Sequence, residues 1–187
     1  YVLFYIIIAF SQIYAKSAPS QSEAGYAMGL GFSPQIFTAL LMYSAVSLAI
    51  SITISGKCID KIGRRIWLIW TTVAVAIFGL ALPYFLENGT TVSLFWFLII
   101  GMGLIGMGYG PLSSFLPELF PTHVRYTGAS LTYNIAGLFG ASVAAIIALP
   151  LNANYGLKGV GIYLTLNAVL SLIGLWFITE TRDRQLL

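Results

Sequence analysis

Long apolar stretches alternate with short polar segments along almost the whole chain. Neither residues 24–56 nor residues 66–86 contain a single Asp, Glu, Lys or Arg. Because about 20 helical residues cross the roughly 30 Å hydrocarbon layer of a bilayer, runs of this length are typical of transmembrane helices. The pattern predicts an all-α membrane protein with six such helices, at about residues 1–15, 34–56, 66–86, 92–117, 126–150 and 159–179.

The polar segments carry residues that begin or end helices. Residues 16–33 are rich in Ser and Gly, and Pro34 suits the first turn of a helix, where its missing N–H is not needed. The decapeptide from Gly56 to Arg65 is expected to form a tight loop, since Gly63 breaks the helical pattern and charges cannot lie in hydrocarbon.

The opening run, residues 1–15, is short for a span. It has neither a basic segment before it nor a clear cleavage site, so a signal peptide is not favoured. We expect a helix that is cut at its front, and hence a fragment of a longer protein.

Basic residues are distributed unevenly between the two sides that six spans would define. One side receives only Lys16 and Lys158, whereas the other receives the remaining seven of the nine Lys and Arg residues. Basic residues concentrate in cytoplasmic loops, so the richer side is predicted to be cytoplasmic, with both chain ends there. The expected location is the cell membrane.

Composition excludes several classes of protein. The chain is 58% hydrophobic and only 8% charged, whereas a soluble domain carries roughly 25% charged residues. The net charge of +3 lies mostly in short loops and does not indicate nucleic-acid binding. The single cysteine, Cys58, excludes an intrachain disulfide and a cysteine-cluster metal site, and no cofactor is expected.

Small residues recur on one side of the fourth predicted helix, at Gly103, Gly106, Gly110 and Ser113. Small faces let helices approach closely in a membrane, where lipid offers no hydrophobic drive for association. A second interpretation is a flexible helix beside a cavity, with Pro111 freeing a carbonyl group. Both interpretations can hold together.

Polar side chains inside the spans are neutral. No Asp, Glu, Lys, Arg or His lies in the middle of a predicted span, and His123 lies in a loop. Buried amides such as Gln12 and Asn134 need hydrogen-bond partners, so they either join helices or line a solute cavity. For Asn167 and Tyr163 the packing role is favoured.

Two loop motifs resemble the major facilitator superfamily. Gly56 to Leu68 fits the pattern G-x-x-x-D-x-x-G-R-[RK]-x-x-[LI], with Cys58 in place of a usual Leu and Lys61 in place of a usual Arg. Glu118 to Arg125 resembles the E-x-x-P-x-x-x-R loop between the fourth and fifth helices of the second half of these carriers.

The extended second motif is most similar to the metabolite:proton symporter group, although Leu112 stands where that group has Gln. The tail from Glu180 to Arg184 is similar to the P-E-T-K/R signature of sugar porters, with Thr179 in place of Pro. The resemblance implies that residues 1–187 are the C-terminal six-helix bundle of a twelve-helix carrier, whose N-terminal half supplies the ionisable residues missing here.

The resemblance also implies a function and its partners. Such carriers work by alternating access, with the solute site between the halves near the midplane. The expected activity is proton-coupled symport of a small organic acid or similar metabolite, in contact with the lipid bilayer. Gln12, Tyr109 and Asn134 resemble cavity-lining positions.

A cytoplasmic latch is the last feature that the resemblance implies. Its expected members are Asp60, Gly63, Arg64, Arg65, Glu118, Arg125 and Glu180. Anchoring to lipid headgroups would explain Lys57, Lys61 and Arg65, but not the carboxylates, which topology does not require. Exposed pairs contribute about 0–1 kcal/mol each, so several would be needed to tilt an equilibrium.

Other classes fit the sequence less well. A sugar-porter-type carrier and a non-transporting membrane scaffold are the alternatives that remain, although a scaffold would not need the Asp and Arg loop chemistry. An intramembrane enzyme would need catalytic side chains inside a span. A channel would need a charged or carbonyl-lined filter, and no such ring is visible in the sequence.

Overall fold

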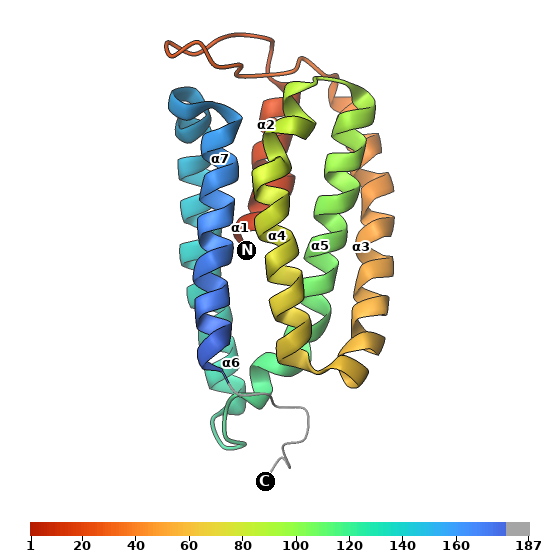
Figure 1. Cartoon of the computed structure of the whole chain (residues 1–187), viewed down its shortest axis with the longest axis vertical. Helices are drawn as coiled ribbons and strands as arrows, with labels where there is room; N and C mark the ends of the chain where they lie inside the picture. Colours follow the sequence, from red (N-terminus) through yellow and green to blue (C-terminus); the bar gives the residue numbers. More distant parts are fainter. Residues whose placement is uncertain (179–187) are drawn as a thin grey trace.

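The computed structural model describes residues 1–178, and they form a bundle of helices that run along its long axis (Figure 1). The elements in chain order are α1 (Val2–Tyr5), η1 (Ile6–Phe10), α2 (Ser11–Lys16), α3 (Pro34–Ile62), α4 (Arg64–Glu87), α5 (Thr91–Glu118), α6 (Arg125–Gly137), η2 (Leu138–Ser142) and α7 (Val143–Phe177). The two η segments are π-helical turns inside otherwise continuous helices. The expectation of an all-α fold is confirmed.

Four helical stretches are long and apolar enough to cross a membrane. They are Pro34–Ile62, Arg64–Glu87, Thr91–Glu118 and the 53-residue stretch Arg125–Phe177. The first helical stretch, Val2–Lys16, is apolar but shorter. Within α7, Gly156 has non-helical angles (φ 67°, ψ −171°), and the chain turns back at the top of the bundle (Figure 1). The last stretch therefore consists of two helical arms.

The turn between α3 and α4 is much tighter than the predicted decapeptide loop, and that prediction is wrong. Helix α3 continues to Ile62 and α4 begins at Arg64, which leaves Gly63 alone between them. Nothing in residues 57–62 interrupts a helix, so the helix carries its charges out of the apolar layer. Gly63 has φ 101°, a conformation that other residues rarely adopt.

Helices α3 and α5 pack closely through small residues. Ser44, Ser51 and Ser55 of α3 are buried, and the Ser47 hydroxyl donates to the carbonyl of Ile99, 3.0 Å away. A Cβ atom added at Gly106 would lie 2.6 Å from the carbonyl oxygen of Leu48. The small-residue face of α5 is thus a packing face, as lipid-embedded helices require.

Helices α4 and α7 form a second close pair. The Thr165 hydroxyl donates to the carbonyl of Ala76 at 3.0 Å, and Gly161 of α7 packs against the backbone of Gly79. The first helical stretch lies beside both pairs and buries Ile6, Ile7 and Phe10 in a shared core. The junction between α3 and α4 and the last turns of α5 lie at the end of the bundle opposite residues 17–33 (Figure 1).

Candidate functional site: a charged helix end and an adjoining cavity

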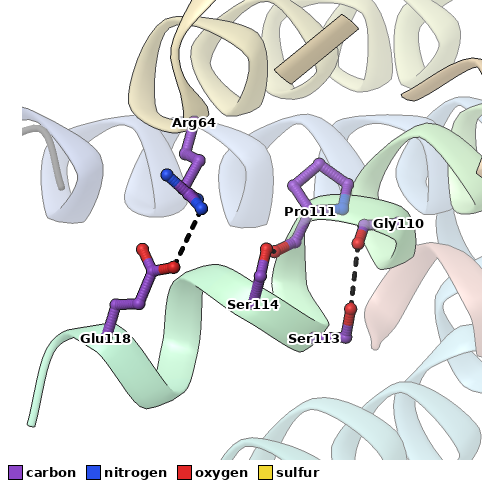
Figure 2. Close-up of polar contacts among 6 residues, drawn as sticks. All are labelled: Arg64, Gly110, Pro111, Ser113, Ser114 and Glu118. Carbon is purple, nitrogen blue, oxygen red and sulfur yellow. Dashed lines mark hydrogen bonds and ion pairs between the residues drawn. The ribbon is translucent and has the colours of Figure 1, made fainter. Parts of the chain in front are cut away.

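An ion pair joins the first residue of α4 to the last residue of α5. Nη2 of Arg64 lies 2.9 Å from Oε1 of Glu118, with side-chain exposures of 17% and 14% (Figure 2). A cation at a helix N-terminus and an anion at a C-terminus both oppose the helix dipole. The helix dipoles therefore disfavour Arg64 and Glu118 at these positions, and the attraction between the two side chains offsets that effect.

Arg65 caps the end of α7 with two hydrogen bonds from its guanidinium. Its Nε donates to the carbonyl of Leu175 at 3.0 Å, and its Nη2 donates to that of Trp176 at 2.9 Å. The last carbonyl groups of a helix lack intrahelical partners, and a cation nearby also favours the dipole. Arg65 thus fastens the start of α4 to the end of α7.

The other predicted latch residues take separate positions. Asp60 is exposed on the last turn of α3, and no described residue bonds to its carboxylate. The Arg125 guanidinium donates to the carbonyl of Phe120 at 3.5 Å and to the Thr122 hydroxyl at 3.3 Å. Glu180 lies outside the described residues. Among the predicted latch residues that the structure describes, Arg64 and Glu118 form an ion pair.

A proline in α5 creates a polar contact that the sequence does not suggest. Pro111 has no N–H, so the carbonyl of Met107 four residues earlier lacks its helical donor. The indole Nε1 of Trp67 in α4 donates to that carbonyl at 3.0 Å. Beyond the proline, the Ser113 and Ser114 hydroxyls donate to the carbonyls of Gly110 and Pro111, each at 3.1 Å (Figure 2).

A cavity of about 340 Å³ lies beside the start of the first helical stretch. Among the predicted cavity residues, Tyr109 lines it, whereas Gln12 and Asn134 do not. Asn134 is exposed, and its Nδ2 donates to the carbonyl of Ser130 at 2.8 Å. The cavity is also lined by Asn167, for which the sequence favours a packing role. Three further polar residues of the lining were not indicated by the sequence: Thr71, Thr72 and Ser171.

Aromatic rings from three helices meet at the edge of this cavity. The ring of Tyr1 packs edge-on against Tyr109 of α5 and Tyr133 of α6, with centroids 6.4 and 5.7 Å apart. Tyr109 also packs against Phe4. No group of His, Cys, Asp or Glu within residues 1–178 could hold a metal ion. The groups that the cavity offers to a small molecule are aromatic rings, hydroxyl groups and an amide.

Four helical stretches that are long and apolar enough to cross a membrane are typical of a multi-pass membrane protein. Residues 25–187 match the family of sugar (and other) transporters. Because this match covers most of the chain, the chain belongs to that family, which lies within the major facilitator superfamily. The family and the relatives below are membrane transporters, not enzymes.

Several curated proteins are similar to the chain over most of its length. A Haemophilus influenzae protein, provisionally named as a metabolite transport protein, is 88% identical over 186 residues, which are 42% of its own length. The inner membrane metabolite transport protein YhjE of Escherichia coli is 40% identical over 187 residues, or 41% of its length.

The proline/betaine transporter of Escherichia coli is 30% identical over 174 residues, covering 86% of this chain and 34% of that protein. The chain thus spans less than half the length of the relatives that it matches. No solved structure matches it significantly.

Proposed function

We propose that this chain is the C-terminal half of a secondary active transporter that moves a small metabolite by alternating access. In this proposal it contributes six transmembrane helices, with the two arms of α7 as parts of the last two. The partner is an N-terminal six-helix half of the same carrier. The length of the relatives, more than twice that of this chain, supports the proposal.

The observation that carries the proposal is the arrangement of charges at one end of the bundle. The Arg64–Glu118 pair joins two helices of the same half, so it braces this half and need not break during the cycle. Asp60 is exposed four residues before Arg64 in the chain, which leaves its carboxylate available to a group outside this half. We assign Asp60 to a latch between halves and Gly63, Arg64, Arg65, Glu118 and Arg125 to its support.

The latch works only if its contacts differ between the two states of the carrier, since an interaction equal in both states shifts no population. Contacts from Asp60 to the other half would form when the cytoplasmic side is closed and break when it opens. The excess of basic residues at this end supports its assignment to the cytoplasmic side of the cell membrane.

The proposed solute is a small organic acid or similar metabolite, carried together with a proton. Tyr109 and the neutral polar groups near it suit a small solute, and Gln12 and Asn134 remain candidates for contact with it within the whole carrier. The middle parts of the spans in residues 1–178 contain no Asp, Glu, Lys, Arg or His. The proton-carrying group would therefore belong to the other half.

Uptake by the full-length carrier in membrane vesicles tests this function. Radiolabelled organic acids, betaines and sugars are offered with and without an imposed proton gradient. Gradient-driven uptake of an acid or betaine supports the proposal. Uptake of sugars alone favours a sugar-porter-type carrier, which the family's name also suggests. Normal membrane insertion without uptake of any solute would favour a scaffold.

A further inference from the structure

Residues 17–33, here called the strap, lie across the end of the bundle opposite the junction of α3 and α4 (Figure 1). Its middle is a small hairpin with an antiparallel bridge between Gln21 and Ala27. The Met28 N–H donates to the Ser20 carbonyl at 2.9 Å, and the Ser22 N–H donates to the Tyr26 carbonyl at 2.8 Å. The strap therefore supports its own shape.

The returning limb of the strap completes the end of α2. The N–H groups of Leu30 and Phe32 donate to the carbonyls of Tyr14 and Ala15, at 3.1 and 2.8 Å. These carbonyls are among the last of the helix and have no intrahelical donor. The strap is thus fixed to the first helical stretch by backbone hydrogen bonds that depend little on side-chain identity.

The hairpin also reaches the turn inside α7. Asn152 is completely buried, and its Nδ2 donates to the carbonyl of Ala27 at 2.9 Å. The ring of Tyr26 covers Gly156, where an added Cβ would lie 2.6 Å from Cδ1 of the ring. No described residue bonds to the buried Oδ1 of Asn152, so Nδ2 supplies the amide's hydrogen bonds. A buried N–H group is costly unless it donates, so the contact with Ala27 favours the docked strap.

We infer that the strap locks the first helical stretch to the turn of α7, with Asn152 and Tyr26 as positioning residues. This inference rests on the proposed transport function. The strap holds two helical segments that lie more than a hundred residues apart in the chain. These segments therefore move as one body during the transport cycle, and access at this end changes between halves rather than within this one.

The first test measures the lock without measuring transport. Asn152→Ala in the full-length carrier removes the donor to Ala27. Amide exchange at Met28 and Ser22 should become about five- to tenfold faster, as the loss of one buried hydrogen bond implies. The matched control is Asn154→Ala, because Asn154 is exposed and bonds only within its own helix, to the carbonyl of Pro150. Equal exchange in both variants would overturn the lock.

The second test asks whether the lock stays closed during transport. Ala27→Cys and Asn152→Cys are combined with Cys58→Ser, and a short bifunctional thiol reagent joins the two cysteines. The bridge should restore slow exchange in the strap and leave the initial uptake rate within about twofold of the unbridged variant. A bridge that stops uptake, with recovery after cleavage of a reducible linker, would overturn the inference. Absence of uptake by the unaltered carrier would instead count against the transport function, and loss of uptake by the unbridged variant alone would show that the lock is needed for transport.

Discussion

Several side chains in this bundle donate hydrogen bonds to carbonyl groups outside their own helix. Trp67 donates to the Met107 carbonyl, which Pro111 leaves without a helical donor. Arg65 donates to the Leu175 carbonyl at the end of α7, and Asn152 donates to the Ala27 carbonyl in the strap. Each donor lies far in sequence from its acceptor. In an apolar environment such contacts specify which helices become neighbours, because an unpaired polar group there is costly.

Loss of the Trp67 indole donor should destabilise the bundle. Trp67→Phe leaves the Met107 carbonyl without a donor, and we expect a loss of about 0.6–2 kcal/mol in unfolding free energy. Thermal unfolding of the purified full-length carrier in detergent measures the change. Trp70→Phe is the matched control, since Trp70 is 69% exposed on the same helix.

A double-mutant cycle separates the hydrogen bond from the packing of the ring. Pro111→Ala returns a helical N–H to the Met107 carbonyl, so Trp67→Phe should cost less in that background. If Trp67→Phe costs the same in the Pro111→Ala background as in the unaltered carrier, the indole acts through packing alone.

The close packing of helices α3 and α5 requires glycine at positions where the two backbones touch, and it does not require glycine elsewhere on α5. Gly106→Ala places a methyl group against the backbone of α3, and overpacking of this kind costs about 1–3 kcal/mol. Gly108→Ala on the same helix meets nothing within 4 Å and should be neutral or slightly stabilising. Unfolding temperatures of the two variants test this difference, and similar values for both would contradict the packing role.

Sequence patterns predict the elements here better than the contacts between them. The apolar runs and the Gly103–Gly106–Gly110 spacing are local signals, and they correctly indicated helices and a close packing face. The extension of α3 to Ile62 does not follow from the charge pattern, because charged residues end an apolar run without ending a helix. A helix continues past the apolar layer until a residue such as Gly63 stops it.

The site was only partly predictable for a similar reason. The loop motifs indicated Arg64 and Glu118 but not that these two would pair, since the contact joins residues 54 positions apart. The polar lining by Thr71 and Asn167 depends on how α4 and α7 face the cavity. Periodicity on one helix does not determine which neighbour that helix meets.

The whole molecule is proposed to be one half of a carrier with both ends of this chain in the cytoplasm. Cysteines placed at Gly89 and at Gln185 in a Cys58→Ser background test that orientation. An impermeant thiol reagent outside intact cells should label the first position and spare the second. Labelling of both positions, or of Gln185 alone, would contradict the topology.

The proposed latch is the central claim for the whole molecule. A substitution at Asp60 distinguishes a latch between the two halves from charged contacts that only stabilise one half. Because Asp60 is exposed and the Arg64–Glu118 pair lies within one half, Asp60→Asn should leave the folded half intact. It should instead shift the resting carrier toward the state that is open to the cytoplasm and impair transport. Lys57→Gln, one turn earlier on α3, is the matched control.

Accessibility of a cysteine near the end of the bundle that is proposed to be cytoplasmic measures this shift most directly. Ser113→Cys in a Cys58→Ser full-length carrier reports whether that end is open, through its rate of labelling in inside-out vesicles. Asp60→Asn should raise the rate about three- to fivefold, as the loss of up to about 1 kcal/mol from the closed state implies. Lys57→Gln should leave it unchanged. An unchanged rate in Asp60→Asn together with wild-type uptake would contradict the latch.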